Sequence, residues 1–292
     1  MYLRLLTHKN LPIKKAITYM LLSALSFSVM NMIIRYVSHL PVFELVFFRS
    51  IGTATLTLVI IKKARIPILG TDKKRLLLRA LFGVSTMAFF YKAIQLMPVG
   101  TAVSLRYLSP IFASAFAIYM LKEKVKPIQW LFFLIAFCGV SLIKGFDARI
   151  TIVGFASIMS AAVLSALVYT TIGRIGNSEH LLVIINYFMV TATIVGAVGC
   201  LFQWTTPQGI EWLLLISLGI LGYAAQLWMT KSLQAAETNL ITPVKYSEAV
   251  FTLIAGWLIF GEGQNWYALA GIFMVIGALV ANVWVKRRKT QG

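Results

Sequence analysis

Residues 95–123 read QLMPVGTAVSLRYLSPIFASAFAIYMLKE, and residues 234–262 read QAAETNLITPVKYSEAVFTLIAGWLIFGE. The second stretch follows the first at a constant offset of 139 residues, and the two align without a gap. Each begins with Gln, carries a basic residue followed by Tyr and then a Phe, and closes with Glu. The matching pairs are Gln95 and Gln234, Arg106-Tyr107 and Lys245-Tyr246, Phe112 and Phe251, and Glu123 and Glu262. Such agreement at one offset indicates an internal duplication.

The composition of the whole chain excludes a soluble or a disordered protein. Of its 292 residues 59% are hydrophobic and only 12% are charged, about half the charged share of a soluble domain. The net charge of +18 could suggest nucleic acid, but no basic helix or aromatic platform lies outside the apolar runs. We therefore expect no nucleic-acid partner and assign the basic loops to membrane orientation and lipid headgroups. Cys138 and Cys200 lie in apolar runs, which favours small buried side chains over a disulfide.

The apolar runs recur along the whole chain and predict membrane-spanning helices, each of which needs about 20 mostly apolar residues. Pro and Gly in a tight turn at Met97–Gly100 separate the third span from the fourth, and the fifth span is short. Ten segments qualify: Ala16–Ile34, Phe43–Ile61, Leu76–Met97, Val99–Leu121, Ile128–Ile143, Ile152–Gly173, Leu181–Phe202, Glu211–Lys231, Asn239–Phe260 and Trp266–Val285.

The loop cations orient the chain. With both chain ends in the cytoplasm, 20 Lys and Arg fall on the inner side and four on the outer side, as the positive-inside rule requires. An odd number of spans in each copy, residues 1–147 and 148–292, inserts the second copy upside down. We therefore predict an all-α polytopic protein of the plasma (inner) membrane, with ten transmembrane helices as two inverted five-helix repeats around a central cavity.

The repeated segments resemble a known family. Ser109-Pro110-Ile111-Phe112 to Glu123, and Glu248-Ala249-Val250-Phe251 to Glu262, are similar to the Pro-Val-Phe…Gly-Glu pattern of the drug/metabolite transporter superfamily, specifically its EamA-like members. Ala249 replaces the second Pro of that pattern, and Lys122 stands where Gly often precedes the Glu. The resemblance implies a small-molecule carrier with a central cavity. Its cargo could be an amino acid, another metabolite, a sugar phosphate or a nucleotide sugar.

Arg106 and Lys245 stand inside apolar spans, where a charge costs about 2.5–3.5 kcal/mol on insertion scales and needs a partner. Lys245 has Glu248 three residues on, which favours an intrahelical pair that would still allow it to face the cavity. Arg106 has no acid within four residues. Either it pairs with an acid of another helix, such as Glu44 or Glu248, or it binds an anionic group of the substrate.

Further residues complete the predicted site. Tyr107 or Tyr246 would stack or hydrogen-bond beside the substrate, and Glu248 is considered for proton coupling. Arg49 is interpreted as structural, paired with Glu44 or a helix end, and Glu123 and Glu262 as helix caps or gate contacts. Other candidates for the cavity wall are Asn31, Tyr91, Asn186, Tyr187, Tyr223, Gln226 and Trp228.

Catalytic motifs are missing from the sequence. It contains no His-Glu-x-x-His, no Gly-x-Ser-x-Gly and no Gly-x-x-x-x-Gly-Lys, so we predict no enzyme, no metal site and no cofactor. The favoured function is secondary transport of a small anionic or zwitterionic metabolite, such as an organic anion, a nucleotide-like cofactor or an amino-acid derivative. The alternatives are an exporter of neutral or cationic amino acids or drugs, and a membrane scaffold or lipid-modifying enzyme. We expect a monomer, although a dimer fits as well.

Overall fold

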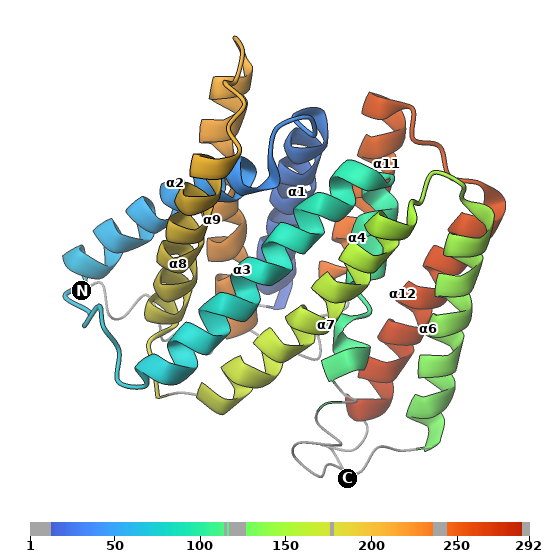
Figure 1. Ribbon diagram of the computed structural model, residues 1–292. Coiled ribbons are helices and arrows are strands. Elements are labelled where there is room, and N and C mark those ends of the chain that lie inside the picture. The colour runs from blue at the N-terminus through green and yellow to red at the C-terminus, as the bar shows by residue number, and fades with distance from the viewer. Residues whose placement is uncertain (1–12, 114–115, 117–126, 176–177, 236–243, 288–292) are drawn as a thin grey trace.

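The structure, a computed structural model, describes residues 13–113, 116, 127–175, 178–235 and 244–287, and there every regular element is a helix (Figure 1). The helices are α1 (Ile13–Tyr36), α2 (Val42–Lys63), α3 (Lys73–Leu96), α4 (Val99–Arg106), α6 (Pro127–Phe146), α7 (Ile152–Ile175), α8 (Leu181–Phe202), α9 (Glu211–Ala235), α11 (Ser247–Phe260) and α12 (Trp266–Arg287).

Six of these helices, α1, α2, α3, α7, α8 and α9, are long and apolar enough to cross a membrane. Shorter apolar segments lie in α6, α11 and α12. These helices are those of an integral membrane protein. The predicted spans Val99–Leu121 and Asn239–Phe260 extend outside the described residues, so the number of ten spans stays a prediction.

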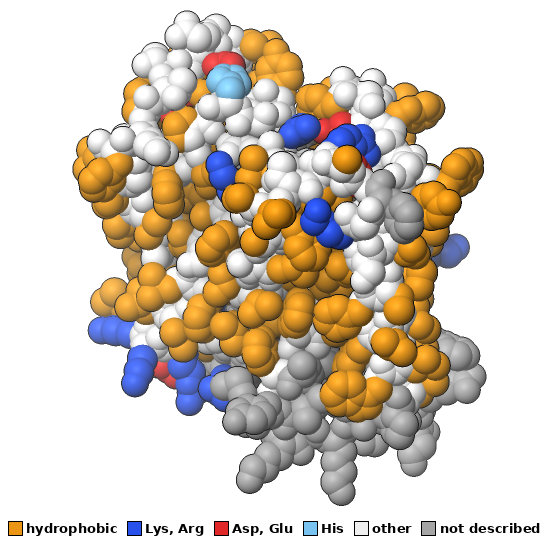
Figure 2. All heavy atoms as spheres, turned by 45° about the vertical axis from the view of Figure 1, so that its right-hand side comes forward, with side chains coloured by type: hydrophobic (Ala, Val, Ile, Leu, Met, Phe, Trp, Pro, Cys, Tyr) orange, Lys and Arg blue, Asp and Glu red, His pale blue; other side chains and the backbone are white. Residues whose placement is uncertain are grey.

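The outer surface is apolar over the middle of the molecule. On the face in Figure 2, hydrophobic side chains cover the middle, while Lys and Arg lie at the lower left rim and in the upper part of the face. Large side chains such as Leu201 and Phe202 are more than four-fifths exposed, which suits a surface facing lipid. The two cysteines are free, as predicted, but Cys138 is exposed on α6 and Cys200 is half-buried, so neither is a buried core residue.

The fourth predicted span is interrupted. Instead of running through to Leu121, α4 ends at Arg106, and a turn at Tyr107 and Leu108 precedes the next helical residues, 109–113. Pro110 explains the break, because its ring clashes with the carbonyl of the residue four positions earlier, Arg106, and it offers no N–H. The prediction of one continuous helix is therefore wrong.

The corresponding point of the second half is interrupted as well. Residues 244–245 are helical, Tyr246 is in a turn, and α11 begins at Ser247. Tyr246 stands 139 residues after Tyr107, the offset of the sequence duplication. Here Ala249 occupies the position of Pro110, so no proline follows this break. Both cation-bearing helices therefore stop beside their cation.

Helices from the two halves of the chain pack against each other throughout. The closest neighbours are α1 with α9, α3 with α7, α2 with α8, and α6 with α12. The α6–α12 pair lies at the right of Figure 1. The crossing of α2 and α9 brings Gly52 against Gly219. A Cβ added at Gly52 would lie 2.8 Å from the Cα of Gly219, so the backbones touch only because both residues are glycine.

Contacts between the halves also close one end of the helix bundle. Glu262 follows α11; its Oε2 accepts a hydrogen bond from the Val99 N–H at the start of α4, at 2.8 Å, and its Oε1 pairs with Arg35 Nε at 2.7 Å. Glu262 is 8% exposed. The interpretation of Glu262 as a helix cap is confirmed, whereas Glu123 lies outside the described residues.

A second set of contacts joins the loop between α2 and α3 to the loop between α7 and α8. Glu179 Oε1 accepts hydrogen bonds from the Thr71 hydroxyl at 2.6 Å and from the Asp72 N–H at 2.6 Å. These donors lower the pKa of the Glu179 carboxyl, with the Thr71 hydroxyl as the largest cause. Nearby, the Tyr187 hydroxyl donates to the Leu69 carbonyl at 2.6 Å, so Tyr187 fastens this end of the molecule.

We predict that Gly52→Ala lowers the melting temperature of the detergent-purified protein, because the new Cβ would meet backbone atoms of α9. Overpacking of this kind costs about 1–3 kcal/mol. Gly277→Ala in α12 is the matched control, because nothing lies within 4 Å of its Cβ position. Equal melting temperatures for the two variants would show that the α2–α9 crossing has room to adjust.

Candidate functional site

A cavity of about 200 Å³ lies between the helices of the two halves. Its wall includes side chains from α1, α2, α3, α7, α8 and α9, and residues on both sides of the two helix breaks. A cavity of this size can hold a small metabolite. Four basic residues, Arg49, Arg79, Arg106 and Lys245, share the wall with one acid, Glu248.

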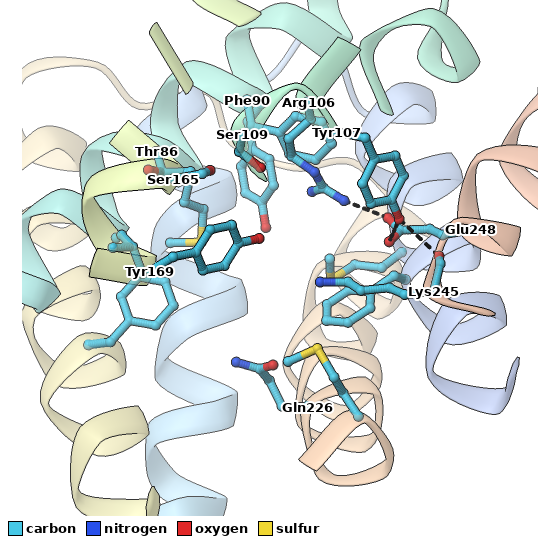
Figure 3. Close-up of a pocket in the computed structure, with 18 of the residues that line it drawn as sticks. Thr86, Phe90, Arg106, Tyr107, Ser109, Ser165, Tyr169, Gln226, Lys245 and Glu248 are labelled. Carbon is cyan, nitrogen blue, oxygen red and sulfur yellow. Dashed lines mark hydrogen bonds and ion pairs between the residues drawn. The ribbon is translucent and has the colours of Figure 1, made fainter. Parts of the chain in front are cut away.

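Glu248 is the most constrained of these residues. Its carboxylate is 0% exposed and binds three groups from the other half of the chain. Oε1 accepts from Arg106 Nη2 at 2.7 Å and from Asn31 Nδ2 at 3.2 Å, and Oε2 lies 2.8 Å from the Tyr107 hydroxyl (Figure 3). Of the two alternatives for Arg106, pairing with an acid of another helix is therefore the one that the structure shows.

Arg106 remains part of the cavity wall despite this pair. Its side chain is 20% exposed, and its guanidinium lies over the Phe90 ring, 4.0 Å from the ring centroid. A guanidinium between an aromatic face and a carboxylate is held by cation–π attraction as well as by the ion pair. Arg106 therefore has a fixed position and a largely compensated charge.

Lys245 behaves differently. Among the residues that the structure describes it forms no ion pair, and the expected intrahelical pair with Glu248 is absent because Glu248 binds Arg106 instead. In Figure 3 the Lys245 amine points into the cavity, on the side opposite Tyr169. Its positive charge therefore faces the space that a ligand would occupy.

The two helix breaks, which lie beside Arg106 and Lys245, contact each other. The Tyr107 hydroxyl lies 3.1 Å from the Lys245 carbonyl oxygen, next to the second break. Tyr246 meets the Tyr107 ring edge to face, with centroids 5.0 Å apart. Interrupted helices are typical of transporter binding sites, because they direct backbone groups toward the cavity. Tyr246 itself packs behind Tyr107 and is not part of the wall.

The other residues predicted for the cavity wall divide into three groups. Tyr91 and Gln226 line the cavity, and the Tyr91 hydroxyl is buried without a partner. Asn31 lies behind the wall as a donor to Glu248. In the described part of the chain, Asn186, Tyr223 and Trp228 are not wall residues, and neither is Tyr187.

Sequence reasoning missed several wall residues. Arg49 does not pair with Glu44, whose Oε2 accepts from the Thr205 N–H at 3.2 Å; Arg49 Nη1 contacts Met87 Sδ at 2.7 Å. Arg79 is one of the 20 cations that the loop count assigns to the inner side, but in the structure it is buried in α3 and lines the cavity. Its spacing from Gly83, Thr86, Met87 and Phe90, all on one helix face, is the signal that could have identified it. Ser165 and Tyr169 of α7 are further wall residues that the sequence did not identify.

The described residues contain no group of three or more His, Cys, Asp or Glu side chains that could hold a metal ion. The site consists of cations, one carboxylate, hydroxyls and aromatic rings. Such a set can bind an anion or a zwitterion by charge and by hydrogen bonds.

Comparison with known proteins identifies a family of transporters. The model of the EamA-like transporter family matches twice, at residues 14–145 and 152–284. The pseudopaline exporter of Pseudomonas aeruginosa is 25% identical, covering 92% of this chain and 96% of its own length. Human solute carrier family 35 member G1 is 26% identical over 90% of this chain and 77% of its own length.

Two further matches extend the comparison. The S-adenosylmethionine uptake transporter of Rickettsia prowazekii is 23% identical over 93% of each chain. A solved crystal structure superposes with a TM-score of 0.66 at 19% identity, covering 94% of this chain and 98% of its own. That structural likeness shows the fold alone.

We predict that Arg106→Gln and Glu248→Gln each destabilise the protein, because breaking a buried ion pair costs about 3–5 kcal/mol. The double variant should lose much less than the sum, since neither charge then lacks its partner. Arg75→Gln, which breaks an exposed pair with Asp72, is the control and should cost less than about 1 kcal/mol. The test compares the melting temperatures of these four variants with that of the parent protein. Strictly additive losses in the double variant would contradict the prediction.

Proposed function

Because the chain belongs to the EamA-like transporter family, we propose that it moves a small anionic or zwitterionic metabolite across the membrane by alternating access. The family and its named relatives are transporters rather than enzymes, and the relatives transport small metabolites. Two inverted repeats, residues 1–147 and 148–292, rock against each other around the central cavity. The termini lie in the cytoplasm, and the chain works as a monomer.

The observation that carries the choice of cargo is the charge of the cavity wall. Four cations face one carboxylate, and that carboxylate is already bound to Arg106. An anionic group would be attracted by the remaining positive charge, whereas a purely cationic cargo would have to displace Arg106 from Glu248. A cationic or neutral cargo is therefore the weaker candidate. Proton coupling through Glu248 would likewise disturb the Arg106 pair.

The packing pattern supports a two-fold repeat, and the odd number of predicted spans in each copy supports its inversion. Exchanging the repeats would turn α1 into α7, α2 into α8, α3 into α9 and the α4 region into the α11 region. Under this exchange the α1–α9 contact becomes α7–α3, α2–α9 becomes α8–α3, and α1–α11 becomes α7–α4. Each of these contacts is present. The two helix breaks, 139 residues apart, obey the same exchange.

We predict that anionic or zwitterionic compounds raise the melting temperature of the purified protein, and that Lys245→Gln weakens their binding at least tenfold. A ligand at one hundred times its Kd stabilises the folded state by about 2.7 kcal/mol, enough to detect. Lys245 forms no ion pair with the residues that the structure describes, so its removal should leave the empty protein folded. Lys231→Gln, on exposed α9 surface, is the control.

The cargo part of this proposal fails if only cationic or neutral compounds stabilise the protein. It fails equally if the Lys245→Gln variant responds to the anions as the parent protein does. Compounds that stabilise the protein are then tested for transport in liposomes, where the parent protein should accumulate or exchange them.

We predict that linking the two halves at one end stops transport. Thr101 Oγ1 and Gln264 Oε1 lie 3.2 Å apart across the end that Glu262 closes. With Cys138 and Cys200 replaced by Ser, Thr101→Cys and Gln264→Cys are joined with a short bifunctional methanethiosulfonate reagent, which attaches to each thiol through a reducible disulfide. Transport into liposomes should stop and should return on reduction. The control cross-link joins Asp72→Cys to Arg75→Cys within one half and should leave transport intact. Unimpeded transport in the protein cross-linked between positions 101 and 264 would rule out rocking at this end.

A further inference from the structure

Two arginines of the cavity wall have no acid beside them. Arg49 of α2 is 6% exposed and Arg79 of α3 is 7% exposed, and neither forms an ion pair within the described residues. Nε of both, and Nη1 of Arg79, are buried without a hydrogen-bond partner. Arg49 Nη1 is bound only by the weakly accepting sulfur of Met87. A buried charge without a partner is among the most costly groups in a protein.

The two guanidiniums also act on each other. Both line the central cavity, and their charges are close enough to repel electrostatically. Like charges held together in a low-dielectric site raise the cost further. Within the described fold the Phe188 ring and the Met87 sulfur offset only part of that cost, so a group that enters the cavity is the natural partner.

Glycine backbone and an aromatic ring hold the two guanidiniums in place. A Cβ at Gly83 would lie 3.1 Å from Arg79 Nη1, and a Cβ at Gly222 would lie 3.4 Å from Arg49 Nε. The Arg79 guanidinium lies on the Phe188 ring, 4.4 Å from its centroid. Stacking covers the face of a guanidinium and leaves its N–H edge free for an acceptor in the plane.

Two more polar groups without hydrogen-bond partners belong to residues of the same wall. Thr86 Oγ1 and the Tyr91 hydroxyl are buried, make no hydrogen bond in the structure and belong to the cavity wall. Both can donate to an oxyanion. Arginine forks and hydroxyls together are the donors that bind carboxylate and phosphate groups most strongly.

We propose that Arg49 and Arg79 form a dedicated anion subsite of the central cavity, and that Lys245 binds a second anionic group of the same molecule. This inference rests on the proposed transport function and narrows its cargo to compounds with at least two anionic groups, carboxylate or phosphate. Arg106 stays with Glu248 and contributes shape instead of free charge. The cavity of about 200 Å³ limits the cargo to a small molecule.

The test measures binding to the purified full-length protein by thermal shift at constant ionic strength. Succinate is compared with propionate, which lacks the second carboxylate, and 2-phosphoglycerate with glycerate, which lacks the phosphate. The doubly anionic member of at least one pair should bind at least tenfold more tightly. The succinate arm identifies a carboxylate in the subsite, and the phosphoglycerate arm a phosphate.

Variants of the two arginines show whether these residues cause the preference for two anionic groups. Arg79→Gln and Arg49→Gln should abolish the preference for two anionic groups, and Arg79→Lys should restore only part of it because it keeps the charge but not the fork. Without ligand, Arg79→Gln should melt no lower than the parent protein, since it removes an uncompensated charge. Arg75→Gln, one helical turn earlier in α3 and exposed, should change neither property.

Two results would overturn the subsite. One is equal binding of the singly and doubly anionic members of both pairs, including the absence of any binding. The other is an Arg79→Gln protein that melts lower than the parent and keeps the preference, as a purely structural arginine requires. If single anions or zwitterions still bind through Lys245, the transport proposal stands while the subsite falls.

Discussion

The carboxylate of Glu248 holds the centre of the molecule together. It is fully buried, and its three donors come from α1, from the end of α4 and from the break that follows α4. A carboxylate without these donors could not remain charged in an apolar interior. The helices of the first half therefore converge on one residue of the second half, and the cavity is the space left around that point.

The sequence identified three charged residues of the site but not their connections. Arg106, Lys245 and Glu248 stand out because a charge inside an apolar run is costly and hence unusual. The partner of Arg106 could not be found by helical spacing, since Glu248 lies 142 residues further on in the chain. Arg79 stands near the start of α3, where a cation resembles one of the neighbouring loop charges.

The two helix breaks differ in the same way, because the first has a local cause in the sequence and the second a tertiary cause. Pro110 provides a local reason for the turn at Tyr107, so this break could have been predicted from sequence. The turn at Tyr246 has Ala249 in the proline position and is visible only in the folded chain. The all-helical membrane fold and the span positions outside these breaks followed from apolar length, which is a local property. The contact of Glu262 with the start of α4 joins residues that are far apart in the sequence.

The uncompensated cations of the cavity affect how the protein can move when it is empty. Closing a cavity around Arg49, Arg79 and Lys245 would strip water from three positive charges, at a high electrostatic cost. A bound dianion removes most of that cost before closure. The loaded form would then change sides faster than the empty form, so the two half-reactions would be kinetically linked. Such a carrier suppresses idle cycling and leak, and it favours exchange of one cargo molecule for another.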